Sequence, residues 1–214
     1  MNLQSYYWYF QSVLSKDFCE NLIKFGNQQR EELALTGGQT DKIKKGDNLT
    51  EEDLKDLKKK RNSNIVWLNE QWIYDEILPY VNTANANSGW NFEFSWSESC
   101  QFTKYKQDQY YDWHCDSWDR PYGEDFDNPN LRGKIRKLSV TCNLTDPSEY
   151  EGGELEFDFR NLDPDKPANV KVCEEIRPQG SIVVFPSHVW HRVKPVTKGT
   201  RYSLVIWSCG YPFK

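Results

Sequence analysis

The stretch Arg201-Tyr-Ser-Leu-Val-Ile-Trp207 alternates two sets of side chains, with the period of a β-strand. One face comprises Arg201, Ser203, Val205 and Trp207, and the other Tyr202, Leu204 and Ile206. Short runs rich in Phe, Trp, Tyr and Val, separated by Gly, Pro, Asn and Asp, fill the chain beyond Gly89. We expect strands at 92–96, 100–105, 138–144, 153–157, 169–172, 181–185, 191–193 and 202–207. This series after a helical N-terminal part predicts an α+β fold, a double-stranded β-helix (jelly roll) buttressed by helices.

The length of 214 residues is typical of one domain and is sufficient to bury a core. We expect a single domain over 1–214, with a helical support region at 1–90 and the jelly-roll core at 91–214. Ser15 is a typical helix N-cap and is followed by an apolar stripe of helical spacing. A second helix is expected at 69–81, with Pro79 close to its end.

A charged insert at 36–64 interrupts the helical region, and its run of basic residues ends at Arg61. Thr50-Glu-Glu-Asp53 has the pattern of a capping box and predicts a short charged helix. Such a segment is typical of a solvated surface element. The alternative interpretation is a lid over the mouth of an active site.

The composition excludes several classes of protein. A net charge of −5 argues against general nucleic-acid binding, which depends on neutralising phosphates. No apolar run approaches the length of a membrane span, and the first residues do not resemble a signal peptide. The six cysteines are scattered without a Cys-x-x-Cys pair, which predicts buried free thiols. We therefore expect a cytoplasmic protein.

The sequence Trp113-His114-Cys115-Asp116 places a His and an Asp two positions apart. In an extended segment both side chains point to the same face, as two neighbouring ligands of one metal must. A further His downstream would complete a 2-His-1-carboxylate facial triad, which holds Fe(II) and leaves coordination positions open. His188 and His191 compete for that third position, and their spacing puts them on opposite faces of an extended segment. We favour His191, since Pro186 and Ser187 make His188 a loop residue.

Arg201 follows His191 by ten residues and begins the strand quoted above. An arginine inside an apolar barrel is costly unless it is paired. Its own face of the strand carries no acidic residue, so the carboxylate of a ligand is a reasonable partner.

Several ordered motifs across 101–208 resemble the catalytic core of prolyl 4-hydroxylase-type Fe(II)/2-oxoglutarate dioxygenases, including bacterial PKHD-type hydroxylases and phage-encoded members. The segments that carry the resemblance are Phe102-Thr-Lys-Tyr105, Tyr111-Asp-Trp-His114-Cys-Asp116, Leu138-Ser-Val-Thr-Cys-Asn-Leu-Thr-Asp-Pro147, Tyr150-Glu-Gly-Gly-Glu-Leu155 and Phe185-Pro-Ser-His-Val-Trp-His191 through Arg201 to Trp207. Arg61-Asn-Ser-Asn-Ile-Val-Trp67-Leu is also similar to phage members. If the protein is phage-encoded, as this resemblance implies, the expected location is the host cytoplasm.

The resemblance implies that His114, Asp116 and His191 bind iron and that Arg201 binds the distal carboxylate of 2-oxoglutarate. It further implies that Tyr105 hydrogen-bonds this co-substrate in a pocket lined by Thr141, Asn143, Leu155, Val193 and Trp207. The chain departs from many relatives at Asn143, where they carry an aromatic residue, and at Ser117-Trp118 after the metal-binding Asp.

The function implied by the resemblance is hydroxylation of an aliphatic C–H bond, with Fe(II), 2-oxoglutarate and O2, and with ascorbate as a further cofactor. We expect a prolyl residue of a peptide or protein as the substrate. The aromatic residues expected at the rim are Tyr110, Tyr111, Trp113, Trp118, Tyr122 and Trp190. The alternatives are a non-catalytic jelly-roll module that binds Zn or Ni, and an oxygenase acting on a small molecule or alkylated nucleic acid.

Overall fold

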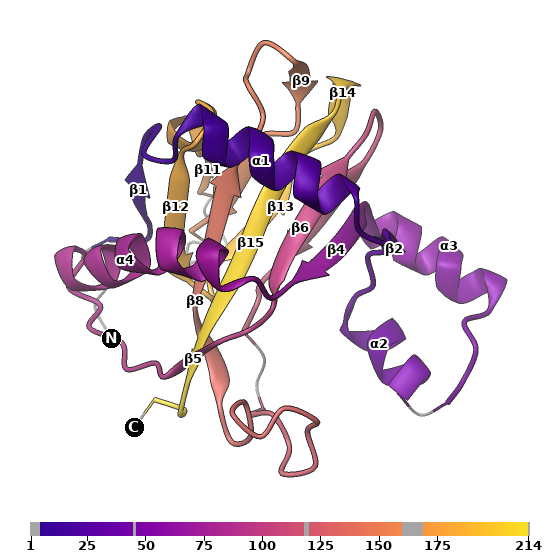
Figure 1. Ribbon diagram of the computed structural model, residues 1–214. Helices are drawn as coiled ribbons and strands as arrows, with labels where there is room; N and C mark the ends of the chain where they lie inside the picture. Colours follow the sequence, from indigo (N-terminus) through magenta and orange to yellow (C-terminus); the bar gives the residue numbers. More distant parts are fainter. Residues whose placement is uncertain (1–4, 45, 118–119, 160–168, 214) are drawn as a thin grey trace.

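The computed structural model describes residues 5–44, 46–117, 120–159 and 169–213, and its strands pair antiparallel throughout (Figure 1). Within these residues the larger sheet has the order β1 (Trp8–Phe10), β12 (Ile182–Pro186), β8 (Ile135–Asn143), β15 (Arg201–Gly210), β6 (Cys100–Tyr105), β4 (Asn64–Leu68) and β2 (Glu32–Leu33), with β5 (Trp96–Ser97) also on β15. The smaller sheet has the order β11 (Val170–Val172), β10 (Leu155–Asp158), β13 (Trp190–Val193), β7 (Tyr110–His114) and β3 (Arg61–Asn62). Strands β14 (Val196–Gly199) and β9 (Tyr150–Gly152) pair as a separate two-stranded sheet. A short 3-10 helix, η1, spans Glu174–Ile176. The expected combination of helices and strands is therefore confirmed, and the strands pair antiparallel.

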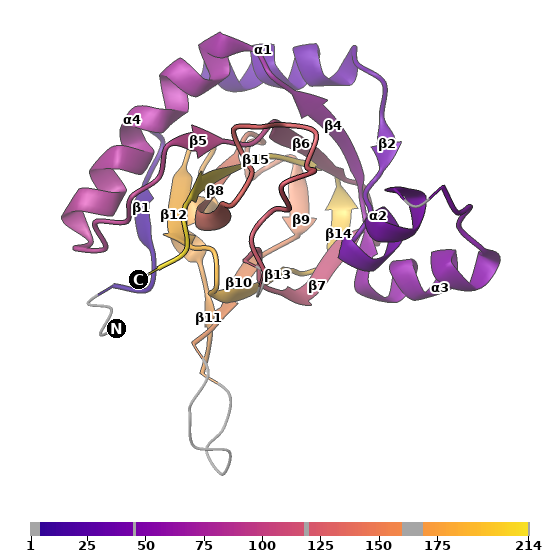
Figure 2. The ribbon, with the colours of Figure 1, turned by 90° about the horizontal axis from the view of Figure 1, so that it is seen from below.

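Two helices, α1 (Lys16–Asn27) and α4 (Gln71–Asn87), cover the outer face of the larger sheet (Figure 2). The side chain of Ser15 accepts a hydrogen bond from the Phe18 amide at 3.1 Å, which confirms the expected N-cap of α1. The outward residues of β15, β8 and β6 join both helices in one apolar core, as Leu204, Val140 and Phe102 illustrate. This cluster attaches the helices to the sheet because it removes both apolar surfaces from water.

The second helix extends beyond its expected end at Val81, so that prediction was wrong. Helix α4 continues through Pro79 to Asn87. Pro79 has no amide hydrogen for the carbonyl of Asp75, but both residues lie on the exposed face, where water can bond that carbonyl. The opposite face is buried in the core and holds the helix past the proline; its buried residues are Ile73, Ile77, Val81 and Ala84.

The strand expected at 92–96 was also wrong, because only Trp96–Ser97 pairs with β15. The side-chain amide of Asn85 donates to the carbonyl of Phe92, and the amide of Phe92 donates to the Asn85 Oδ1, both at 2.9 Å. The side chain of Asn85 thus satisfies the backbone groups that a neighbouring strand would otherwise bond.

The charged insert forms α2 (Gly37–Lys44) and α3 (Glu51–Lys60), which project beyond the edge of the larger sheet in Figure 1. Thr50 and Asp53 make the expected capping box at the start of α3. The interpretation of the whole insert as solvated surface is wrong at its end. There Arg61 is only 5% exposed, because β3 pairs with β7 and draws the chain into the smaller sheet.

All six cysteines are free, as expected, and five of them are buried. No helix among the described residues is long and apolar enough to cross a bilayer.

Candidate active site

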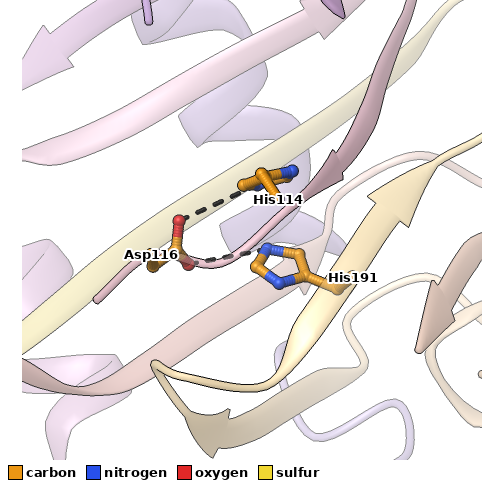
Figure 3. Close-up of side chains that lie close together, drawn as sticks. All are labelled: His114, Asp116 and His191. Atoms are coloured by element: carbon orange, nitrogen blue, oxygen red, sulfur yellow. Dashed lines mark ion pairs between the residues drawn. The ribbon is translucent and has the colours of Figure 1, made fainter. Parts of the chain in front are cut away.

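The side chains of His114, Asp116 and His191 converge between the two sheets (Figure 3). His114 is the last residue of β7, and His191 lies directly opposite it on β13. Asp116 follows in the loop after β7, with its Oδ1 at 3.8 Å from the His114 Nε2 and its Oδ2 at 3.5 Å from the His191 Nε2. One potential ligand atom from each residue lies within 4.8 Å of the others. The structure therefore brings together the three residues that the sequence motif selected.

Hydrogen bonds to the backbone orient both imidazoles. The Nδ1 of His114 lies 2.8 Å from the carbonyl oxygen of Asp112, and the Nδ1 of His191 lies 3.0 Å from that of Val189. A carbonyl oxygen can only accept, so each Nδ1 carries a hydrogen, and in a neutral imidazole the lone pair is then on the Nε2 that faces Asp116. Metal binding through Nε2 requires this tautomer.

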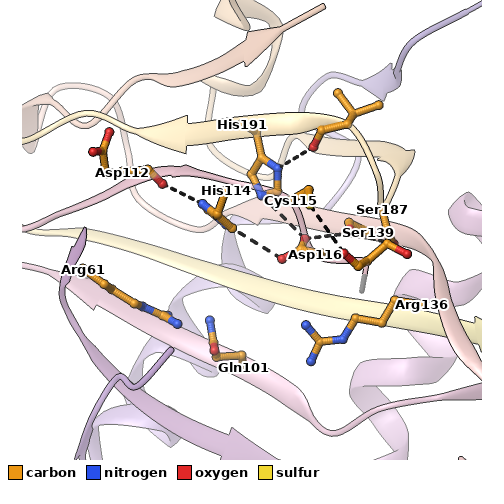
Figure 4. Close-up of polar contacts among 12 residues, drawn as sticks. Arg61, Gln101, Asp112, His114, Cys115, Asp116, Arg136, Ser139, Ser187 and His191 are labelled. Atoms are coloured by element: carbon orange, nitrogen blue, oxygen red, sulfur yellow. Dashed lines mark hydrogen bonds and ion pairs between the residues drawn. The ribbon is translucent and has the colours of Figure 1, made fainter. Parts of the chain in front are cut away.

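Asp116 is held by two serines that the sequence motifs did not reveal. The Ser139 hydroxyl donates to the Asp116 Oδ2 at 2.7 Å, and the Ser139 and Ser187 hydroxyls lie 2.9 Å apart (Figure 4). The Asp116 amide also donates to the carbonyl of Ser187 at 2.9 Å. These contacts fix the direction of the carboxylate, and both serines are fully buried.

The protonation states suit a divalent cation. Burial, together with the neighbouring His191, holds the pKa of His114 well below its usual range, so this imidazole is neutral at pH 7. Burial alone would raise the pKa of the Asp116 carboxyl, but His191, His114 and the Arg136 guanidinium bring it to about 2. The pair thus presents a neutral nitrogen and an ionised oxygen near neutral pH.

His188 lies outside this group. It is exposed, in the turn that separates β12 from β13, whereas His191 is only 6% exposed. These positions agree with the loop that Pro186 and Ser187 predicted at His188, which was the reason for favouring His191.

Arg201 lies at the start of β15 with only 2% of its surface exposed. It pairs in register with Tyr105 of β6, and its Cζ lies 5.7 Å from the Tyr105 ring centroid. Its buried Nη1 has no hydrogen-bond partner, and no carboxylate of the described residues forms an ion pair with it. Gly153, at φ +67°, leaves room for this side chain, since a Cβ there would lie 3.0 Å from the Arg201 Cδ. A buried guanidinium with an unused donor is suited to a carboxylate ligand.

The inner face of the larger sheet carries polar residues as well as apolar ones such as Val183 and Phe185, so the expected apolar barrel around Arg201 holds only in part. Its buried polar residues are Gln101, Thr103, Ser139, Thr141, Asn143 and Ser203. Sequence alternation alone puts these side chains opposite the apolar outer face that packs on the helices. A buried wall of hydroxyl and amide groups favours a polar ligand.

The other residues assigned to the co-substrate pocket lie in different parts of this space. Leu155 and Val193 are paired on the smaller sheet and belong to one apolar cluster with Tyr105. Thr141 faces inward from β8, with 6% exposed. The Asn143 amide instead donates to the carbonyls of Thr145 and Arg177, at 3.0 and 2.7 Å, while its Oδ1 has no partner.

Two arginines near the triad were missed as site residues. Arg136 makes a bidentate ion pair with Glu98, with both contacts at 2.6 Å, and its Cζ lies 3.8 Å from the ring centroid of Trp207. The Arg61 guanidinium lies over the Tyr111 ring, 4.4 Å from its centroid. Sequence reasoning grouped Arg61 with exposed lysines, although the similarity of Arg61-Asn-Ser-Asn-Ile-Val-Trp67-Leu to phage members was a signal that could have separated it from them.

The rim residues expected from the sequence vary in position. The Tyr111 ring stacks on His114, with centroids 3.5 Å apart, and Tyr122 donates to the Glu98 Oε1 at 2.7 Å. The Tyr110 hydroxyl donates to the carbonyl of Lys58 at 2.6 Å and so ties the end of α3 to β7. Trp118 lies outside the described residues.

Comparison with known proteins shows one family. A model of the 2OG-Fe(II) oxygenase superfamily matches residues 100–209. A PKHD-type hydroxylase of Prochlorococcus marinus is 37% identical over 91 residues, which cover 42% of this chain and 37% of that protein. A PKHD-type hydroxylase of Xylella fastidiosa is 34% identical over 110 residues, which cover 50% of this chain and 42% of that protein. The chain thus spans less than half the length of these curated relatives.

Similar solved structures include a viral collagen prolyl hydroxylase of Paramecium Bursaria Chlorella virus-1, determined as a 2OG complex. Its TM-score is 0.60 at 22% identity, covering 96% of this chain and 97% of that chain. A Pseudomonas putida prolyl-4-hydroxylase gives a TM-score of 0.57 at 18% identity, covering 95% and 91%. These likenesses show that the fold is shared along nearly the whole chain.

Proposed function

Because the chain belongs to the 2OG-Fe(II) oxygenase superfamily, we propose that it is an Fe(II)- and 2-oxoglutarate-dependent hydroxylase of an aliphatic C–H bond. His114, Asp116 and His191 are the proposed metal ligands, and Arg201 is the proposed anchor of the co-substrate. The observation that carries the proposal is the convergence of two imidazoles and one carboxylate between the sheets, beside a buried arginine with an unused donor.

The donor set fits the metal that the family name specifies. Two imidazole nitrogens and one carboxylate oxygen, contributed from one side, are the ligands of non-haem Fe(II) sites with open coordination positions. A module that only binds Zn or Ni does not require a buried guanidinium aligned with Tyr105. The unpaired Arg201 therefore favours the enzyme over the non-catalytic alternative.

The chain's own residues have separate tasks in this proposal. Ser139 and Ser187 hold the Asp116 carboxylate in place, and the carbonyls of Asp112 and Val189 hold the two imidazoles. Arg201 neutralises and orients one end of the 2-oxoglutarate dianion. With iron and 2-oxoglutarate bound, O2 would be the oxidant and 2-oxoglutarate would supply two electrons: one oxygen atom would enter the C–H bond as a hydroxyl group, and the other would enter succinate as CO2 is released.

The proposal extends to the jelly-roll fold and to the class of substrate. The facing antiparallel sheets, with the triad between them, support the jelly-roll description of 91–214. The names of the similar proteins support a prolyl residue of a peptide or protein as the substrate.

The chemistry is tested by adding Fe(II) and then 2-oxoglutarate to the purified protein without oxygen. The expected result is a weak visible charge-transfer band that requires both components and disappears in Asp116→Ala. A protein that binds iron but never develops this band with 2-oxoglutarate would contradict the proposal.

The substrate class is tested by measuring succinate release and product mass with proline-containing peptides. We expect the peptides to stimulate succinate release and to gain one oxygen atom on proline. If a free amino acid or an alkylated oligonucleotide stimulates release and peptides do not, the prolyl assignment is wrong and the dioxygenase chemistry stands.

A further inference from the structure

Arg61 is a second buried guanidinium beside the site. It is 5% exposed, and its Nη2 is buried without a hydrogen-bond partner. The Nε donates to the Ser63 hydroxyl at 3.0 Å, and the Nη1 donates to the carbonyl of Leu35 at 3.3 Å. Two donor groups therefore anchor the side chain, while the third remains available.

The position of Arg61 directs this third group into the site. Its guanidinium lies over Tyr111, whose other neighbour is the imidazole of His114. In Figure 4 the Arg61 side chain points toward Gln101, which lies below the triad in that view. The positive charges of Arg61 and Arg201 also both lower the pKa of Tyr105, although burial, the larger effect, raises it. Arg61 thus lies against the ring that stacks on a proposed metal ligand, and its charge acts on the same tyrosine as that of Arg201.

The charges of the site leave Arg61 uncompensated. The Arg136 charge is balanced by its ion pair with Glu98. A divalent metal and Arg201 together balance the Asp116 carboxylate and a dianionic 2-oxoglutarate. No carboxylate of the described residues forms an ion pair with Arg61. Since an unpaired buried charge is strongly unfavourable, a ligand that brings its own negative charge is the expected partner.

We propose that Arg61 binds a carboxylate of the substrate, so that the enzyme prefers peptides with an anionic group close to the residue that it hydroxylates. This inference rests on the proposed function and specifies its substrate class. A carboxylate accepts from the free Nη2 in a charge-assisted hydrogen bond, while the stacked Tyr111 holds the guanidinium plane. The carboxylate can come from the C-terminus of a short peptide or from an acidic side chain next to proline.

The test compares three peptides of equal length. One is acetyl-Ala-Pro with a free C-terminal carboxylate, one is acetyl-Ala-Pro-amide, and one is acetyl-Asp-Pro-amide. Binding is measured by anaerobic calorimetry on protein loaded with Fe(II) and 2-oxoglutarate, and turnover by kcat/KM. We expect one of the two carboxylate peptides to be favoured over the neutral amide by about tenfold or more, the usual effect of a hydrogen bond to a charged group. Which of them is favoured identifies the source of the carboxylate.

The variants show whether Arg61 causes this preference. Arg61→Met is expected to bind the charged and neutral peptides equally, and Arg61→Lys to keep part of the preference. Lys60→Met removes the same charge from the exposed neighbouring residue and is the matched control, with an unchanged preference. The ratio between peptides is measured within each variant, so a lower yield of folded Arg61→Met does not affect it.

Two results would overturn the inference. The first is equal binding of charged and neutral peptides by the wild-type protein. The second is a preference for the charged peptide that survives in Arg61→Met. If this variant also loses affinity for 2-oxoglutarate, Arg61 binds the co-substrate and not the substrate. Failure of the proposed function gives a different result. None of the peptides would then be hydroxylated, whereas calorimetry would still measure whether Arg61 favours binding of the charged peptides.

Discussion

His191 approaches Asp116 from the opposite strand, whereas His188 lies exposed in the preceding turn. We therefore expect His191→Ala to abolish iron retention and turnover, because it removes one of three ligands. His188→Ala is the matched control, and it should leave iron binding nearly intact. Metal content after gel filtration measures both. Loss of iron in His188→Ala alone would show that the choice of ligand is wrong.

Arg201 is the residue on which co-substrate affinity should depend. Removing a buried charge-assisted pair costs on the order of 2–5 kcal/mol, so Arg201→Ala should greatly raise the apparent KM for 2-oxoglutarate. Arg201→Lys should recover only part of this affinity, since an ammonium lacks the planar fork. Titrations with 2-oxoglutarate at fixed Fe(II) measure the change. Unaltered affinity in Arg201→Ala would remove this assignment.

At the scale of single elements, α3 begins at a capping box that also joins it to α2. The Asp53 carboxylate accepts from the amide and hydroxyl of Thr50, at 3.0 and 2.9 Å, and from the Lys42 ammonium at 2.5 Å. The Lys42 ammonium, followed by the Thr50 donors, lowers the pKa of Asp53 from 3.8 to about 2. A folded-state pKa below the unfolded value means that these contacts stabilise α3 above pH 3.8 and are lost as the pH falls through about 2.

The corresponding prediction compares the wild type with Asp53→Asn. Amide hydrogen exchange in α3 should be faster in Asp53→Asn at pH 7, while exchange in α1 should be unchanged. The difference between the two proteins should shrink as the pH falls from about 4 toward 2, where the wild-type carboxyl also becomes neutral. A difference that persists unchanged at the lowest pH would show that the charge of Asp53 has no part in it.

At the scale of the whole molecule, stability depends on the close contact of α1 with the larger sheet. Gly26 allows this contact, because a Cβ there would lie 2.6 Å from the Phe102 ring. Gly26→Ala gains about 1 kcal/mol of helix propensity. The overlap with a fully packed ring costs about 1–3 kcal/mol, so we expect net destabilisation. Urea unfolding measures it, with Lys24→Ala on the exposed face of α1 as a near-neutral control. A more stable Gly26→Ala protein would contradict the packing argument.

Elements with strong local signals were predicted well. Strand β6 has the expected bounds, Cys100–Tyr105, and α1 starts at the expected cap. Strands β8 and β15 are longer than expected, although their alternation correctly separated inner from outer residues. The segments 8–10 and 61–68 were not predicted as strands, because they lie in a region of helical and charged composition. They become strands by pairing with β12, β7 and β6, which are distant in sequence.

The sequence by itself determined which side chains are available to the proposed site and, in β15, on which face of the strand they lie. His114 and Asp116 were selected by spacing, His191 by the loop signal at Pro186 and Ser187, and Arg201 by alternation, all of which depend only on near neighbours in the chain. Only the tertiary structure decided what surrounds them. The Ser139 hydroxyl on β8 donates to the Asp116 carboxylate in the loop after β7. Arg61 is buried because β3 pairs with β7. Such contacts depend on which strands pair and in what register, and no local pattern in the sequence encodes this pairing. Burial between the paired strands then makes each unpaired charge costly.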